Sequence, residues 1–291
     1  MQASPTAHED VDVRRRADGA LCVSADGAER LILSERAWET TFFGRRCHRI
    51  ELADGVERWA IAAPNAFRRV MGATIAAADE EGVDLLDLNL DISGIGSCAT
   101  LEQLGFRLVD TRMTFRTRFD RREALPFALE RGRLGWVEPR HRDGVVDLTL
   151  RSLPRNPEFI SRFKHPDFFS PAEAERYFTA WIDNLINDDR ALFAVVEDAE
   201  GLAGYFIYRR DPDVDGLPTY KGILVAVEPR LRGQRAHLAL QCFLYEAFDA
   251  DVVWLDNTTQ VSNLAVIKNH MASRKKLDEI VLTFFRKRPD A

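Results

Sequence analysis

The sequence predicts a mixed α/β protein built on a central sheet, because one order of elements occurs twice along the chain. Each time a helix, a strand, a second helix and a second strand follow one another, and a hairpin precedes only the later set. Hydrophobic residues make up 46% of the 291 residues and charged residues 30%, so the chain can bury a core and is not disordered as a whole.

The first set lies in the first half of the chain. Apolar residues at helical spacing predict a helix over 65–81, which Gly82 ends, and alternating leucines predict a strand over 83–91. A short helix over 99–104 and a long alternating strand over 107–119 complete the set.

The second set repeats this order near the end of the chain. We expect its helices and strands, in order, over 236–248, 252–256, 262–271 and 277–285. Two similar sets indicate duplication of half a fold.

Several elements precede only the second set. Ser170 and Pro171 are a typical start for a helix that we expect to run through Asn187. We expect strands over 145–150, 191–198, 204–210 and 221–227, the middle two forming a hairpin around Glu200 and Gly201. The later half is therefore predicted to be the complete domain and the earlier half a partial copy.

These elements predict four segments. They are a disordered tail over 1–20, a partial domain over 21–124, a linker over 125–142 that is rich in Arg, Pro and Gly, and a complete domain over 143–291.

Composition excludes several classes of function. A net charge of −6 gives no reason to expect binding to nucleic acid. The four cysteines are scattered, which argues against a metal site. No apolar run is long enough to span a membrane, and the polar N-terminus is not a signal peptide, so we expect a cytoplasmic protein.

The most informative segment is a strand, a basic turn and a helix. Apolar residues 222–227 lead into Glu228 and Pro229, and the helix follows the turn. The candidate ligand-binding residues of this segment are Val225, Val227, Arg230, Arg232, Gly233, Gln234 and Arg235, and those of the turn would contact an anion. Free N–H groups and the helix dipole favour negative charge at such a turn, although an ordinary solvated connection remains an alternative.

The turn resembles a signature of the GCN5-related N-acetyltransferase (GNAT) superfamily, Val-x-Pro-x-x-Arg-Gly, here from Val227 to Gly233. More of the chain, about residues 35–286, is similar to the dTDP-fucosamine acetyltransferase family. The similar segments are 38–44, 101–106, 161–163, 177–184 and 259–263.

This resemblance implies a partial GNAT half followed by a complete GNAT domain, and an acyl transfer from a pantetheine thioester to an amine. In the superfamily the turn holds the diphosphate of coenzyme A, and an Asn here hydrogen-bonds the pantetheine arm, which corresponds to Asn263. His270 takes the place of a Tyr that protonates the departing thiolate. An unperturbed imidazole titrates near neutral pH, which suits an acid. Backbone N–H groups from Val225 to Val227 would stabilise the oxyanion.

The acceptor amine is expected near the helix that starts at Ser170. The candidate residues for binding it are Arg162, Phe168, Phe169, Tyr177 and Trp181. Core packing of the aromatic residues and a structural salt bridge of Arg162 remain alternatives.

The turn departs from the superfamily, because Arg235 and His237 stand where small residues let the backbone approach a diphosphate. An acyl carrier protein presents its thioester without 3′-phospho-ADP and would not need that cradle. Such proteins are acidic, and a basic face could steer one: Arg209, Arg210, Lys221, Arg230, Arg232, Arg235, Arg274, Lys275 and Lys276.

We therefore expect an N-acyltransferase of small-molecule biosynthesis that uses a carrier-protein thioester or acyl-CoA and no metal, and that could be a homodimer. The alternatives are an acetyl-CoA-dependent N-acetyltransferase acting on an amino nucleotide-sugar, and a degenerate GNAT domain that binds without chemistry.

Overall fold

The computed structural model describes residues 11–123, 129, 131–231 and 233–289. The chain folds into two compact units, of which the first comprises Met1–Thr111 with Ile280–Ala291 and the second comprises Arg112–Glu279. Both units combine strands and helices, which confirms the predicted mixed α/β class.

The first unit contains a sheet in the order β1-β2-β3-β4-β5-β12. The strands are β1 (Val11–Arg15), β2 (Leu21–Ala25), β3 (Ala28–Glu35), β4 (Cys47–Leu52), β5 (Leu85–Asp91) and β12 (Lys276–Lys287). Neighbouring strands are antiparallel except β4 and β5, which are parallel.

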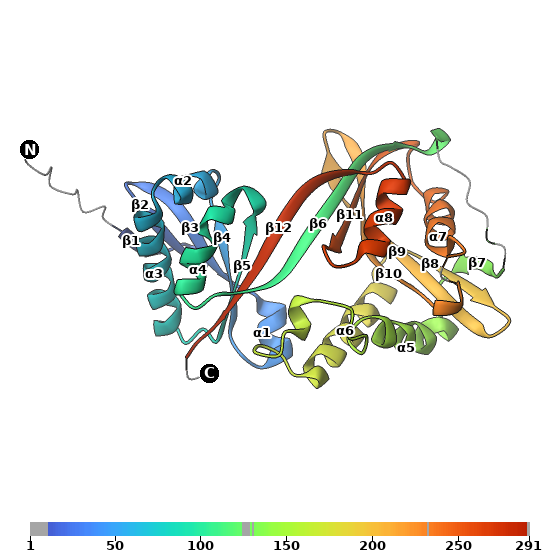
Figure 1. Ribbon diagram of the computed structural model, residues 1–291, viewed down its shortest axis with the longest axis horizontal. Helices are drawn as coiled ribbons and strands as arrows, with labels where there is room; N and C mark the ends of the chain where they lie inside the picture. The colour runs from blue at the N-terminus through green and yellow to red at the C-terminus, as the bar shows by residue number, and fades with distance from the viewer. Residues whose placement is uncertain (1–10, 124–128, 130, 232, 290–291) are drawn as a thin grey trace, which may run out of the picture. The chain divides into compact units, whose positions relative to one another are not determined.

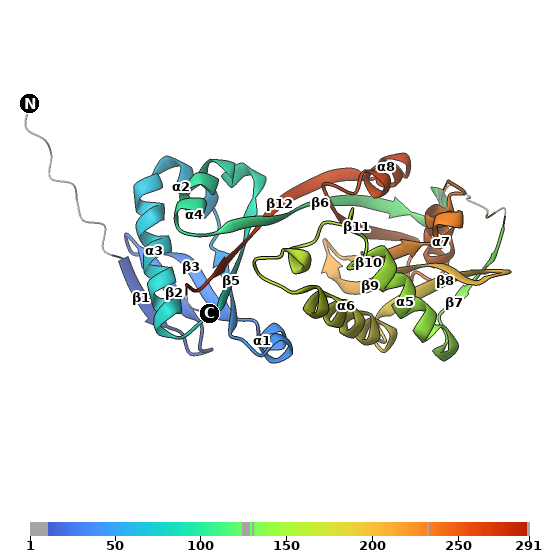
Figure 2. The same cartoon turned by 60° about the horizontal axis from the view of Figure 1, so that its bottom comes forward.

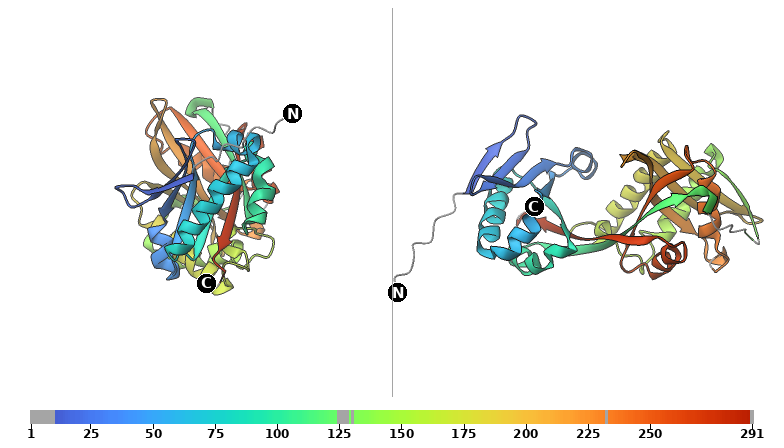
Figure 3. Two further views of the ribbon diagram at one scale, coloured as in Figure 1. Left: turned by 90° about the vertical axis from the view of Figure 1, so that its left-hand side faces the viewer. Right: turned by 90° about the horizontal axis from the view of Figure 1, so that it is seen from above.

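The helices of the first unit are α1 (Ala37–Phe43), α2 (Val56–Ala62), α3 (Pro64–Glu80) and α4 (Cys98–Gln103). Helix α3 packs on one face of this sheet, with α2 and α4 beside it, whereas α1 contacts β4 (Figure 3). Helix α3 buries Phe67, Val70 and Met71 in one apolar core with Leu88 of β5 and Phe284 of β12. This spacing is the helical period that the sequence shows.

The second unit contains a sheet in the order β6-β11-β10-β9-β8-β7. The strands are β6 (Arg107–Asp120), β7 (Arg133–Trp136), β8 (Ala191–Asp198), β9 (Gly201–Val214), β10 (Leu217–Val227) and β11 (Val252–Gln260). Among the described residues of this sheet, β10 and β11 alone pair in parallel.

Helices lie on both faces of this second sheet (Figures 1 and 2). They are α5 (Arg142–Ser152), α6 (Pro171–Ile186), α7 (Ala236–Tyr245) and α8 (Leu264–Ala272). Alternate residues of β9 separate the faces, because Tyr205 packs with α5 and α6 whereas Phe206 and Tyr208 pack with α7.

Both predicted sets of elements are present, and the last strand of each completes the sheet of the other unit. The first set is α3, β5, α4 and β6, yet residues 112–120 of β6 pair with β11. The second set is α7, β11, α8 and β12, yet residues 281–287 of β12 pair with β5. Each sheet therefore depends on a strand contributed by the other half of the chain.

The predicted strand over 145–150 is wrong, because these residues lie in helix α5. Val145, Leu148 and Thr149 are its buried residues, which is a helical spacing. In the helix the buried hydroxyl of Thr149 is satisfied, because it bonds the carbonyl of Val145 and the hydroxyl of Tyr205, each at 2.7 Å.

Two other segments are more ordered than the sequence suggests. Val11–Arg15, expected within a disordered tail, form β1 and pair with β2. Arg133–Trp136, expected within a linker, form β7 and pair with β8. Residues 1–10, 124–128 and 130 lie outside the described residues.

Because β12 completes the sheet of the first unit, a substitution in β12 tests how far that unit depends on this strand. Phe284 is fully buried, so we expect Phe284→Ala to lower the unfolding free energy by roughly 3–5 kcal/mol. Leu277→Ala, on the same strand but 47% exposed, is the matched control and should change it by less than about 0.5 kcal/mol. Denaturant unfolding followed by circular dichroism measures both, and equal effects would contradict the assigned role of β12.

Candidate active site

The centre of the second sheet opens where β10 and β11 part. The two strands pair in parallel only from Thr219 with Trp254 to Gly222 with Asn257. Beyond that point β10 continues along β9 as far as Val227, and β11 continues along β6 as far as Gln260. We call the diverging segments, residues 223–227 and 258–260, the fork.

A bulge and a glycine mark the base of the fork. The register of β10 against β9 shifts between Gly222 and Leu224, and such a bulge bends its strand. The Oδ1 atom of Asn257 lies 2.6 Å from where a Cβ on Gly222 would stand. Only glycine therefore leaves room for the Asn257 amide at this point.

The backbone of β10 offers donors toward the fork. The N–H of Glu228 donates to the carbonyl of Ala203 in β9 at 2.8 Å. Because successive residues of a strand direct their polar groups to opposite edges, Ala226 also faces β9, whereas Val225 and Val227 direct theirs toward the fork. Val225 and Val227 are two of the residues expected from the sequence to stabilise the oxyanion.

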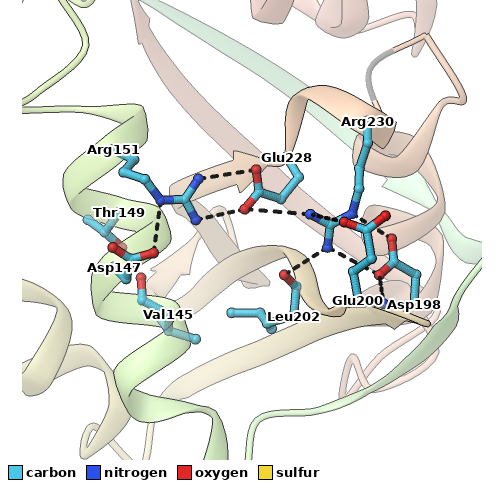
Figure 4. A network of polar contacts seen from close by, with 9 residues as sticks. All are labelled: Val145, Asp147, Thr149, Arg151, Asp198, Glu200, Leu202, Glu228 and Arg230. Atoms are coloured by element: carbon cyan, nitrogen blue, oxygen red, sulfur yellow. Dashed lines mark hydrogen bonds and ion pairs between the residues drawn. The ribbon is translucent and has the colours of Figure 1, made fainter.

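The turn after β10 contains a network of ion pairs (Figure 4). Arg151 of α5 holds the buried carboxylate of Glu228 with two hydrogen bonds, of 2.7 and 3.2 Å. Arg230 holds Asp198 in the same way, at 2.8 and 3.1 Å, and lowers the pKa of Asp198. Glu200 lies 3.7 Å from Arg230. The charge of Arg230 is thus already balanced by carboxylates.

The rest of the turn leads to an uncapped helix. Arg235 is the N-cap of α7 in the left-handed conformation, with φ 59°, and no side chain caps the helix. Gly233 is also left-handed, with φ 81°, and Gln234 donates to the carbonyl of Arg230 at 2.9 Å. Arg232 lies outside the described residues. The N–H groups at the start of α7 therefore remain candidates for binding an anion.

His237 does not obstruct the turn as expected. Its side chain is 7% exposed and packs against Phe206, with ring centroids 5.2 Å apart. The departure from the superfamily at this position consequently affects the core beneath the turn and not the surface that an anion would approach.

Asn263 stands on the other side of the fork as the N-cap of α8. Its Oδ1 accepts from the N–H of Val266 at 3.3 Å, which is the capping role that a helix start requires. Among the described residues no protein group accepts from its amide NH₂, so that donor is available to a ligand.

His270 is buried in the same region, and its expected near-neutral pKa is wrong. Burial first, then the charges of Lys275 and His237, lower the pKa of His270 to about 2. Burial and Lys275 likewise lower the pKa of His237 to about 3. Both imidazoles are neutral near pH 7, which does not suit His270 to the role of an acid.

The predicted acceptor-binding residues gather on the opposite face of the sheet, at α6 and the segment before it. Phe168, Phe169 and Tyr177 are all less than 9% exposed, and Trp181 is half-buried. The rings of Phe163 and Tyr177 stack at 3.8 Å. Burial of this kind is what core packing produces.

Arg162 differs from these aromatic residues. Its guanidinium lies over the Phe163 ring at 4.7 Å, and its buried Nη1 has no hydrogen-bond partner among the described residues. No ion pair of Arg162 with another described residue explains that burial, so its unpaired N–H group is available to an acceptor.

Four of the nine residues of the expected basic face are paired with carboxylates. Arg209 and Lys221 pair with Asp211, Arg210 pairs with Asp213 and Asp249, and Arg230 pairs with Asp198. Lys275 is 6% exposed and belongs to the core. Arg274 and Lys276 have no ion-pair partner within the part of the chain that the structure describes.

Sequence reasoning missed the polar residues beneath the fork. Tyr208 is fully buried, donates to Asn257 at 3.1 Å and contacts Gln241 at 3.2 Å and Lys275 at 3.3 Å. The apolar runs around these residues predict strands and a helix but give no sign of which side chains meet. A polar residue inside an apolar run, such as Gln241, is the one signal that the sequence offers.

Two further features concern the described residues as a whole. Their His, Cys, Asp and Glu side chains form no group of three or more that could hold a metal ion. Among their helices, none combines the length and hydropathy that crossing a bilayer requires.

Gly222 provides a test of the fork. In Gly222→Ala the new methyl group meets an amide that Tyr208 holds in place, so we expect a loss of roughly 1–3 kcal/mol in unfolding free energy. Gly135→Ala in β7, where a Cβ meets nothing within 4 Å, is the control and should change stability by less than about 1 kcal/mol. Equal stability of the two variants in urea would show that the Asn257 amide moves aside and does not constrain Gly222.

The buried histidines predict acid sensitivity. A histidine with a lowered folded pKa leaves the unfolded state with more bound protons, so its contribution to stability is lost as pH falls below about 6.5. We expect His270→Leu to reduce the pH dependence of stability between pH 6 and 4 by up to about 1.4 kcal/mol per pH unit. Met271→Leu at the exposed neighbouring position is the control. An unchanged slope in His270→Leu would mean that the ring is solvated.

Comparison with known proteins shows which fold the chain has. No protein-family model and no curated protein matches the chain. Solved structures do: a GCN5-related N-acetyltransferase from Sphaerobacter thermophilus is 12% identical with a TM-score of 0.58, over 93% of this chain and 81% of that one. A tandem GNAT protein from the clavulanic acid biosynthesis pathway is 14% identical with a TM-score of 0.57, over 98% and 85%.

A functionally unknown conserved protein from Staphylococcus epidermidis is also similar, at 9% identity and a TM-score of 0.57, over 89% of this chain and 92% of that one. At such identities the similarity concerns the fold. The chain therefore has the fold of GCN5-related N-acetyltransferases, as the sequence predicts, and a tandem GNAT protein is among the structures that it resembles.

Proposed function

We propose that the second unit is an N-acyltransferase, which moves an acyl group from a pantetheine thioester to an amine of a small biosynthetic intermediate. One observation carries this proposal: the fork presents the backbone N–H groups of Val225 and Val227 on one side and the available amide of Asn263 on the other. A pantetheine arm is an extended chain with two amides, which such donors and acceptors bind well.

The chemistry needs few groups from the protein. The neutral amine attacks the thioester carbon, a C–N bond forms, and the carbonyl oxygen becomes an oxyanion that accepts from the N–H of Val225 or Val227. When the C–S bond breaks, the thiolate takes up the proton that the amine releases, through solvent. An ordinary thiol has a pKa near about 8.5, so its departure requires no strong acid.

His270 would contribute as a neutral group. An imidazole whose pKa is about 2 stays uncharged near pH 7 and can donate one N–H without transferring it. We therefore assign His270 and Asn263 to positioning the donor and not to proton transfer.

The acceptor would enter from the face of α5 and α6. The buried and unpaired Nη1 of Arg162 could hold a carboxylate or phosphate of that molecule. Of the predicted aromatic residues, the half-buried Trp181 is the one best exposed to contact it.

The donor is proposed to be a carrier-protein thioester in preference to acyl-CoA. The carboxylates of Glu228, Asp198 and Glu200 surround Arg230, so the turn opposes a diphosphate more than a basic turn would. Arg235 in place of glycine adds bulk where the backbone of the superfamily approaches the ligand.

A second candidate is acetyl-CoA-dependent acetylation of an amino nucleotide-sugar. The resemblance of segments such as 177–184 and 259–263 to dTDP-fucosamine acetyltransferases supports it. A third candidate is binding without chemistry, which the neutral His270 supports.

A thioester-cleavage assay with a panel of small amines separates the three. With one acyl group on both donors, we expect kcat/KM to be at least about tenfold higher for the carrier-linked thioester than for acyl-CoA, because the carboxylates around Arg230 oppose the diphosphate of CoA. Efficient turnover of acetyl-CoA with an amino nucleotide-sugar would favour the second candidate, and binding of the donor without amine-dependent cleavage would favour the third.

Asn263→Asp separates the two roles of this residue. Asp caps a helix as well as Asn does, so we expect stability to change by less than about 0.5 kcal/mol. The variant lacks the NH₂ donor, and KM for the thioester should rise roughly 3–10-fold. Asn263→Ala, which loses the cap as well, is the comparison variant. Unchanged kinetics in Asn263→Asp would remove the amide from donor binding.

A further inference from the structure

Polar side chains are buried between α7 and α8, beneath the base of the fork. Tyr208 joins three of them, since its hydroxyl contacts Asn257, Gln241 and Lys275. Lys275 is 6% exposed and makes no other hydrogen bond through its ammonium group among the described residues. An ammonium group has three N–H donors, so those of Lys275 that do not contact Tyr208 are available to a ligand.

Two histidines beside this group are buried without partners. The ring centroids of His237 and His270 lie 6.0 Å apart. Neither nitrogen of His237 has a hydrogen-bond partner among the described residues, and Nδ1 of His270 and Nδ2 of Asn257 also lack one. Buried polar groups are almost always satisfied, so several unpartnered ones together mark a place that can bind a polar ligand.

The charge of this cluster has one sign. Lys275 lowers the pKa of both histidines, and no carboxylate is among the groups that affect Lys275, His237 or His270. A buried ammonium without a counter-charge is unfavourable, and a negative ligand would relieve that penalty.

We infer that His237, Asn257, His270 and Lys275 form a buried binding site for a small carboxylate. The cluster presents one ammonium group and several neutral N–H donors, which match the single charge and two oxygens of a carboxylate. A phosphate dianion would leave a second charge uncompensated.

The carboxylate has two possible sources. One is a free carboxylic acid. The other is the end of the acyl chain of the donor, because Asn257 lines both this cluster and the base of the fork at Gly222. This second source rests on the proposed function, whereas the site itself does not.

Thermal unfolding of the protein tests the site. We expect sodium acetate, malonate or succinate, at constant ionic strength against sodium chloride, to raise Tm by about 2–4 °C at ten times the dissociation constant. Lys275→Met should abolish this shift, and Lys276→Met, the exposed neighbour, should retain it. No shift in the wild type with any of the three anions would overturn the inference.

The pH dependence of the shift decides the case if Lys275→Met does not fold. Burial lowers the pKa of Lys275 to about 7, so its ammonium is present below pH 7 and lost above it. The titratable groups that face Lys275 are Tyr208 of β9, His237 and Cys242 of α7, and His270 of α8, and Tyr245 of α7 bonds Tyr208. Anion-dependent stabilisation should be larger at pH 6 than at pH 9, and equal or inverse values would contradict the site.

Succinyl- and acetyl-pantetheine separate the two sources. Tighter binding of the succinyl thioester, by tenfold or more and lost in Lys275→Met, would assign the carboxylate to the donor. Equal binding of both thioesters, with the anion shift retained, would assign it to a free acid. Failure of both thioesters to bind would count against the proposed function and leave the anion site standing.

Discussion

The structure depends most on the contact between Asn257 and Gly222, at the point where β10 and β11 stop pairing. Because no side chain stands on Gly222, the amide of Asn257 can lie against the backbone of β10 and bond Tyr208. The bulge that follows keeps β10 on β9 while β11 stays on β6. The donors of Val225 and Val227 are thereby left without a strand to bond.

Electrostatics then distinguishes this site from a simple diphosphate cradle. Outside the fork, Asp198 and Glu228 neutralise Arg230 of the turn. Beneath the fork, Lys275 and two neutral histidines create an unbalanced positive charge within the core. The cluster beneath the fork therefore suits an anionic ligand better than the turn does.

The sequence predicts elements well where apolar periodicity is long, as in α3 (Pro64–Glu80), and where caps are strong, as at Ser170, whose hydroxyl bonds Glu173 in a capping box. It fails at 145–150, where three apolar residues fit a strand or a helix. It assigns Lys275 to the surface because a run of basic residues, Arg274 to Lys276, is usually solvated. Burial of a single lysine and the pKa of His270 depend on tertiary contacts that no local pattern encodes.

The central claim is that the fork receives a pantetheine thioester. A crystal structure with a non-hydrolysable thioether analogue of acetyl-pantetheine tests this most directly. The account predicts that the arm lies between residues 223–227 and Asn263, with its carbonyl oxygen at hydrogen-bond distance from the N–H of Val225 or Val227. An analogue bound elsewhere, or strands β10 and β11 paired through residues 223–227 and 258–260, would contradict it.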